Sequence, residues 1–120
     1  MKKRFTVRRA RERDLDPILK IEAASFGVDA YDRKLFAEYT RICGELFLVA
    51  EAGTKVVAYA IVAPSPSRTP NRAELVSIAV SPAFLERGAA TALMDSILRR
   101  LNETAAFVRV VEGSKVCQNL

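Results

Sequence analysis

The stretch Ala79–Met94, AVSPAFLERGAATALM, decides how this chain folds. An apolar run ends at Pro82, a short loop follows with Arg87 and Gly88, and a segment of small residues starts at Ala89. Apolar residues then recur at i, i+3, i+4, i+7, i+8 and i+11, the spacing of one buried helix face: Ala90, Leu93, Met94, Ile97, Leu98 and Leu101. The pattern predicts a strand, a tight turn and a core-facing helix that begins near Gly88.

Three apolar segments upstream of this stretch predict strands. The run AELVSIAV (73–80) leads into the turn, and the proline-rich loop PSPSRTPNR (64–72) separates it from the preceding strand. The runs ELFLVAE (45–51) and KVVAYAIVA (55–63) are joined by AGT and predict a hairpin. Both runs are almost continuously apolar, which is typical of central strands covered on two faces.

The ends of the chain complete the expected order of elements. RFTVRRA (4–10) alternates like a half-exposed strand, and a helix is expected from Asp16 as N-cap with Pro17 at its first position. A second helix is expected after Asp32, and AAFVRVV (105–111) predicts a last strand parallel to 73–80. The expected fold class is α/β (α+β), a mixed central sheet in the order β-α-α-β-β-β-α-β, and residues 1–120 form a single domain.

Composition excludes several classes of protein. A chain of 120 residues buries one core, and no apolar run approaches the ~20 residues of a membrane helix. MKKR is followed by FTVRRARERD instead of an apolar signal segment, so we expect a cytoplasmic protein with no membrane partner. There is no histidine, which removes His-based nucleophile pairs and HExxH zinc sites, and we expect no metal. Two cysteines do not make a disulfide framework.

The first thirteen residues are strongly basic, with seven lysines and arginines against Glu12. Such a strand could attract nucleic acid or a phosphorylated ligand. It is also typical of an edge strand that its charges protect from aggregation. No aromatic residues are interleaved for base stacking, so we favour the edge strand and do not expect nucleic acid as a partner.

The turn before the last helix has the features of a phosphate site. A helix N-terminus exposes unpaired N–H groups and the positive end of its dipole. Gly88 permits close approach, Ala89 and Ala90 keep the next turn slim, and Arg87 adds a positive charge. An equally open alternative is that these small residues let the helix pack tightly on the sheet.

The order of elements and the run VSIAVSPAFLERGAATALMDSIL resemble the GCN5-related N-acetyltransferase (GNAT) superfamily over roughly residues 5 to 112. That family carries [QR]-x-x-G-x-[GA] between its fourth strand and third helix. Here the six positions run from Leu85 to Ala90; Gly88 and Ala90 match, and Leu85 departs from Gln or Arg. IEAASFGVDAY and SIAV look most like the ribosomal-protein N-terminal acetyltransferases.

The resemblance implies acetyl-CoA as cosubstrate and assigns its contacts. Main-chain groups at the end of the fourth strand would hold the pantetheine arm where that strand splays from the fifth: Ile78, Ala79 and Val80. Backbone amides of the turn would hold the pyrophosphate: Glu86, Arg87, Gly88, Ala89, Ala90 and Thr91. The loop between the first two helices would select the acceptor through Phe26, Asp29 and Tyr31, or would simply be a capped turn over one packed aromatic residue.

Acid–base groups are harder to assign. The resemblance favours Glu74 as general base, although a strand glutamate is also commonly ion-paired, here with Arg72. Glu112 and Glu22 are weaker candidates; burial on an apolar stripe could raise the pKa of Glu22, or it could pair with an arginine. Many relatives use a tyrosine acid on a later helix. This chain ends at Leu120, so we expect it to lack the last helix and two strands of the fold and to cover its exposed edge as a homodimer.

Two functions follow from this sequence. The first is an N-acetyltransferase that moves acetyl from acetyl-CoA to a primary amine, either a small molecule or a protein N-terminus, by direct attack. The second is a degenerate relative that binds CoA, or only dimerises, without catalysis.

Overall fold

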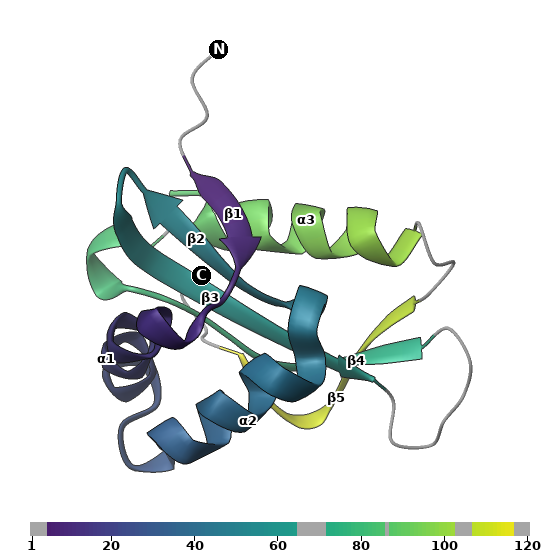
Figure 1. The fold of residues 1–120 in the computed structure, drawn as a ribbon, viewed down its shortest axis with the longest axis horizontal. Helices are drawn as coiled ribbons and strands as arrows, with labels where there is room; N and C mark the ends of the chain where they lie inside the picture. Colours follow the sequence, from purple (N-terminus) through teal and green to yellow (C-terminus); the bar gives the residue numbers. More distant parts are fainter. Residues whose placement is uncertain (1–4, 65–71, 86, 103–106, 117–120) are drawn as a thin grey trace.

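The computed structural model describes residues 5–64, 72–85, 87–102 and 107–116. Its centre is a five-stranded sheet in the spatial order β1-β2-β3-β4-β5 (Figure 1). The pairs β1–β2, β2–β3 and β3–β4 are antiparallel, and β5 is parallel to β4. The strands are β1 (Thr6–Arg9), β2 (Phe47–Ala52), β3 (Lys55–Pro64), β4 (Arg72–Val80) and β5 (Phe107–Val116).

Helices cover both faces of this sheet. α1 (Leu15–Phe26) and α2 (Arg33–Cys43) pack on one face, and α3 (Ala89–Asn102) packs on the other (Figure 1). Four single turns of 3₁₀ helix connect these elements: η1 (Glu12–Asp14), η2 (Gly27–Asp29), η3 (Gly44–Leu46) and η4 (Pro82–Phe84). The expected fold class, element order and parallel last strand are therefore confirmed.

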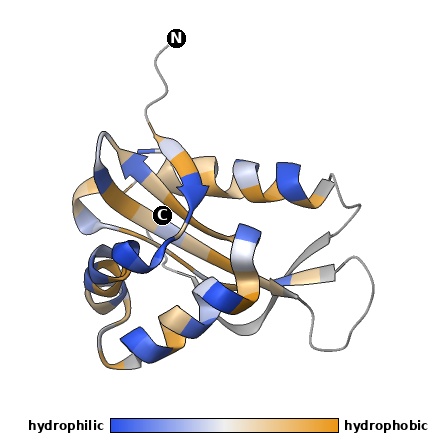
Figure 2. Ribbon diagram, viewed as in Figure 1, coloured by the Kyte–Doolittle hydropathy of each residue, from blue (hydrophilic) through white to orange (hydrophobic). Residues whose placement is uncertain are grey.

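The core is split into two layers by the sheet. Residues 47–50 of β2 and 56–62 of β3 are buried, so both strands are covered on two faces as predicted. One layer joins the sheet to α3 through Leu93, Ile97 and Leu101, and the other joins it to α1 and α2 through Ile18 and Phe36. Figure 2 shows hydrophobic residues concentrated on the central strands and hydrophilic residues on the outer helices.

Two details of the helices differ from the sequence predictions. α1 begins at Leu15, so Asp16 and Pro17 lie inside its first turn, because the η1 turn continues directly into the helix. On α3 the predicted stripe is buried at Ala90, Leu93, Ile97 and Leu101 and partly buried at Met94, but Leu98 is 46% exposed. Leu98 lies at the margin of the apolar face, where the sheet no longer covers the helix.

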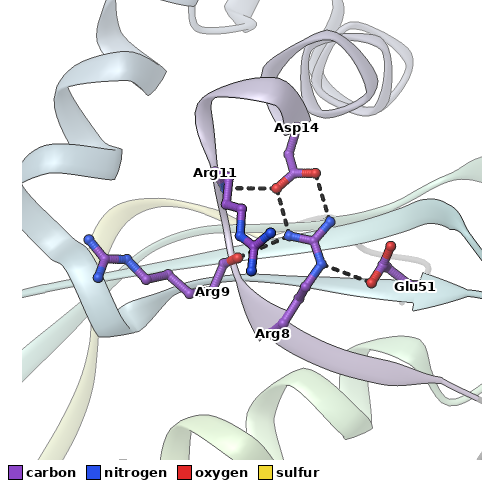
Figure 3. Close-up of polar contacts among 5 residues, drawn as sticks. All are labelled: Arg8, Arg9, Arg11, Asp14 and Glu51. Carbon is purple, nitrogen blue, oxygen red and sulfur yellow. Dashed lines mark hydrogen bonds and ion pairs between the residues drawn. The ribbon is translucent and has the colours of Figure 1, made fainter.

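The basic N-terminal strand is an edge strand, as favoured from the sequence, but one of its arginines is fixed rather than solvated. Arg8 donates to both carboxylate oxygens of Asp14 at 2.8 Å and to Glu51 of β2 at 2.8 Å (Figure 3). Asp14 also accepts the Arg11 amide at 2.7 Å. This network ties the edge strand to its neighbour and to the start of α1.

Strand β4 contains a β-bulge at Val76. Ser77 pairs with Ile61 of β3, and Leu75 pairs with the next residue, Val62, so Val76 is an extra residue. The pairing of β4 with β5 is also interrupted between Leu75 and Ser77. Val76 packs against the layer of α1 and α2, and Ser77 bonds to Tyr59 of that same layer. Two successive side chains therefore face α1 and α2, next to the interruption between β4 and β5.

Candidate active site

The turn before α3 has the geometry of an anion site. Gly88 has a φ of +94°, which favours glycine, and a Cβ added there would meet nothing within 4 Å. The first i to i+4 bond at this end runs from the Ala92 amide to the Gly88 carbonyl at 2.9 Å. The amides of Ala89, Ala90 and Thr91 precede that bond and have no carbonyl within the helix to which they could donate. Gly88 and Thr91 are exposed whereas Ala89 and Ala90 are buried, so a pyrophosphate would meet this turn at Gly88 and Thr91.

Two cations lie near this turn, and the sequence pointed to only one of them. The Arg87 guanidinium carbon is 6.0 Å from the centre of the Phe84 ring. Lys55 Nζ, brought by the start of β3, is 5.7 Å from the same ring. Lys55 thus lies beside the 3₁₀ turn that leads into α3, and Arg87, in the turn before α3, favours a negatively charged ligand there. Glu86, the remaining predicted residue of the turn, lies outside the described residues.

The three positions predicted to hold a pantetheine arm end β4. Ile78 faces the α3 layer and pairs with Val116, the last described residue of β5. Ala79 and Val80 lie beyond that pair and are held on their other side by β3. Four residues of β5 lie between Val110 and Lys115, where β4 has only Val76 between their partners. The interruption between β4 and β5 therefore lies opposite the bulge, before Ile78, and not at the end of β4 where the splaying was predicted.

Two of the predicted bases, Glu74 and Glu112, lie close to this irregularity in the pairing of β4 and β5. Glu74 is partly exposed and pairs in register with Ala63 and Arg109. Its neighbours Ala73 and Leu75 face α3, so alternation directs Glu74 toward the side of α1 and α2. It lies two residues, or about 7 Å along a strand, before the bulge. Glu112 belongs to the excursion of β5.

The predicted acceptor loop is built from aromatic residues that pack on one another. Phe26 ends α1 and, like Tyr31, is packed against the core layer below. The ring of Tyr31 is centred 6.0 Å from Phe36 and 6.5 Å from Tyr39. Asp29 ends η2. The loop is therefore a turn packed over aromatic residues, which is one of the two alternatives from the sequence. It lies on the same side of the sheet as Glu74.

A buried polar cluster lies beneath this loop, and the sequence predicted only one of its members. Glu22 is fully buried; one carboxyl oxygen accepts the Tyr31 amide at 2.7 Å and the other accepts the Tyr59 hydroxyl. Tyr59 OH is also 2.9 Å from Ser77 Oγ. A polar residue inside each of three apolar patterns was the signal that could have revealed the cluster, because buried polar groups need partners.

Other groups contribute less to chemistry. Burial raises the pKa of Cys43 to about 11, so its thiol is protonated at neutral pH and is a poor nucleophile. Across the described ranges, no group of three or more acidic, cysteine or histidine side chains could hold a metal ion. In those same ranges, no helix is both long and apolar enough to cross a bilayer.

The site is therefore built on a mixed sheet whose bulged fourth strand passes through a glycine turn into a helix N-terminus. A model of the acetyltransferase (GNAT) family matches residues 14–117. This chain belongs to the acetyltransferase (GNAT) family, whose activity is acyl transfer from acetyl-CoA. No curated protein matches its sequence.

Solved structures share this fold at low sequence identity. Ard1 from Thermoplasma volcanium is 24% identical with a TM-score of 0.79, over 90% of this chain and 71% of that one. The ribosomal-protein-S18-alanine N-acetyltransferase from Escherichia coli is 23% identical with a TM-score of 0.72, over 92% and 68%. Diaminobutyrate acetyltransferase EctA from Paenibacillus lautus, solved with its substrate and coenzyme A, is 17% identical with a TM-score of 0.77, over 88% and 64%.

Proposed function

We propose that the protein is an N-acetyltransferase that transfers the acetyl group of acetyl-CoA directly to a primary amine. The observation that carries this proposal is the run from the bulge at Val76 to the open N-terminus of α3 at Gly88. At one end of this run is the exposed turn at Gly88, which supports a pyrophosphate there, and at the other end the pairing of β4 is interrupted. The amine is either a small molecule or a protein N-terminus.

Each group has a role in this reaction. The exposed turn at Gly88 and Thr91 receives the pyrophosphate, and Ala79 and Val80 offer main-chain groups to the pantetheine arm. Acetyl-CoA supplies the acetyl group as a thioester. The amine nitrogen attacks the thioester carbonyl carbon; a C–N bond forms, the C–S bond breaks, and the thiolate leaves. The amine proton passes through water to Glu74, and solvent protonates the thiolate.

A direct transfer is supported by the lack of an activated nucleophile among the described residues. The Cys43 thiol is buried and protonated at neutral pH. With no covalent intermediate on the protein, amine and thioester must be bound together, and their relative placement supplies much of the rate.

A second candidate, a CoA-binding module without catalysis, is favoured by the state of the tyrosines. Burial raises the pKa of Tyr31, Tyr39 and Tyr59 above the ordinary value, and nearby groups such as Glu22 add to the effect at Tyr31 and Tyr59. A tyrosine with a raised pKa is a weaker acid than an ordinary tyrosine, which disfavours all three as substitutes for the tyrosine acid of many relatives. In this candidate the cofactor binds but no acceptor is acetylated.

Calorimetric titration with acetyl-CoA, followed by a screen of amines for release of free CoA, separates these candidates. Micromolar binding with turnover supports the transferase, and micromolar binding without turnover on any amine supports the second candidate. No heat of binding by a folded protein would refute both and would favour a relative that only dimerises. Light scattering on the same sample tests the proposed homodimer, which would cover β5 at the edge of the sheet.

A further inference from the structure

Three side chains distant in sequence form one buried polar chain between the acceptor loop and the bulge of β4. The Tyr31 amide donates to Glu22, the Tyr59 hydroxyl donates to the other oxygen of Glu22, and Ser77 lies 2.9 Å from the Tyr59 hydroxyl. Glu22, Tyr59 and Ser77 are each 0% exposed. They come from α1, β3 and β4, so the chain crosses the layer that separates the loop from the sheet.

The direction of these hydrogen bonds is fixed by the number of protons. A tyrosine hydroxyl has one hydrogen, and Tyr59 donates it to Glu22. The bond between Tyr59 and Ser77 must therefore be donated by Ser77. Donors from the bulge side and from the loop side thus converge on the single carboxyl group of Glu22.

Tyr59 can act as a bridge in this chain but not as a proton donor to the reaction. Its burial, and then its bond to Glu22, raise its pKa far above the ordinary value. The hydroxyl therefore keeps its proton at neutral pH. Its ring is fixed by edge contact with Phe36, with centroids 5.6 Å apart, which holds the hydroxyl in place.

Such a chain is costly if its only purpose is packing. A buried carboxyl loses its hydration, and apolar residues of similar volume generally pack as well as or better than buried polar networks. A fully satisfied network does, however, select one arrangement of the groups that it joins. Here those groups are the residue after the bulge, Ser77, and the loop residue Tyr31.

We propose that Glu22, Tyr59 and Ser77 are positioning residues that couple the bulge of β4 to the loop between α1 and α2. Through them, acetyl-CoA bound along β4 stabilises the loop that receives the amine. This inference rests on the proposed function, because it needs a ligand on β4. Coupling of this kind is reciprocal, so an amine on the loop also strengthens binding of acetyl-CoA.

The Tyr31 amide reports the coupling directly, because it lies at the loop end of the chain. We would measure its hydrogen exchange by NMR in the wild-type protein with and without saturating acetyl-CoA. The expected result is slower exchange on addition of acetyl-CoA, by about 10-fold, the usual scale of coupling between sites. In Tyr59→Phe the bridge is lost, so acetyl-CoA should bind but leave this exchange rate unchanged.

Two further variants keep the test decisive. Tyr39→Phe removes a hydroxyl from α2, outside the chain, and should respond to acetyl-CoA like the wild type. Ser77→Ala removes only the link to the bulge; it should also uncouple the loop, and it serves if Tyr59→Phe does not fold. A response of Tyr31 in both Tyr59→Phe and Ser77→Ala equal to that of the wild type would overturn the inference.

Failure of the proposed function would look different. If calorimetry shows no binding of acetyl-CoA to the folded wild-type protein, the proposed function is refuted and the coupling with it. If acetyl-CoA binds but the Tyr31 amide of the wild-type protein does not respond, only the coupling is refuted. If Tyr59→Phe is less stable than the wild type but its Tyr31 amide still responds to acetyl-CoA as in the wild type, the chain has a packing role alone.

Discussion

Arg8 and Asp14 form a bidentate ion pair: Nη1 and Nη2 of the guanidinium lie 2.8 Å from Oδ2 and Oδ1 of the carboxylate, respectively. Asp14 is nearly fully buried, and the same Arg8 reaches Glu51 on the neighbouring strand through Nε. One side chain thus joins the edge strand, the next strand and the start of α1. The ion pair therefore helps to hold residues 5–13 on the sheet.

We predict that Asp14→Asn lowers the free energy of unfolding by about 2 kcal/mol, because it removes charge-assisted hydrogen bonds from a buried group. Urea unfolding measures this loss. The control is Asp16→Asn, which breaks the exposed ion pair with Arg33 and should cost less than about 0.5 kcal/mol. Equal effects of the two variants would show that burial of the Arg8–Asp14 pair is energetically unimportant.

The same pair predicts how stability depends on pH. Burial alone would raise the pKa of Asp14, but its bonds from Arg8 and from the Arg11 amide outweigh burial and lower the pKa below its ordinary value. A lowered folded-state pKa stabilises the protein above the unfolded value of about 4, and the effect disappears as the pH falls through the folded value. The free energies of unfolding of the wild type and Asp14→Asn should therefore converge as the pH falls below 4. A constant difference across that range would contradict the assignment.

For the proposed anion site we predict that Thr91→Glu weakens binding of acetyl-CoA by at least about 10-fold, through repulsion of the pyrophosphate. Thr91 is exposed in the first turn of α3, where an acidic side chain is favourable for the helix, so the fold should keep its stability. Calorimetry gives the affinity and thermal unfolding the stability. Thr91→Gln, equal in size but neutral, is the control, and similar affinities for the two variants would argue against a phosphate at this position.

For the proposed base we predict that Glu74→Gln lowers kcat by about 100-fold, the scale of general base catalysis. Affinity for acetyl-CoA should not change, because Glu74 lies before the bulge and not at the turn. Steady-state kinetics with the best amine of the screen measures both quantities. Glu38→Gln, which changes an exposed glutamate on α2, should leave kcat at the wild-type level. A fully active Glu74→Gln would leave the chain without a base on this strand.

The elements that the sequence predicted well are those determined by local patterns. The spacing of Leu93, Ile97 and Leu101 defined α3, and Asp32 was correctly predicted as the cap of α2, since it accepts the Leu35 amide at 3.0 Å. The apolar runs of β2 and β3 defined the centre of the sheet. In each case the signal and the structure depend on neighbouring residues alone.

The features that the sequence did not predict depend on contacts between distant residues. α1 begins earlier than predicted, with Asp14 rather than Asp16 as its N-cap residue, because Asp14 is held by hydrogen bonds from Arg8 and from the Arg11 amide. Tyr59 and Ser77 have no local signal beyond being polar in apolar strands, and their pairing with Glu22 appears only once α1 is packed on the sheet. Within the candidate site, the sequence therefore pointed to the backbone turn at Gly88 and to Glu22, and it missed Tyr59 and Ser77.

The bulge in β4 is separable from the rest of the fold. Ile61 and Val62 are adjacent, whereas their partners Ser77 and Leu75 are separated by Val76 alone. In a chain from which Val76 is deleted, β4 would pair one-to-one with β3. All the remaining side chains of β4 would keep their present faces. A single deletion would therefore make β4 regular against β3, whereas its pairing with β5 would stay interrupted by the four extra residues of β5.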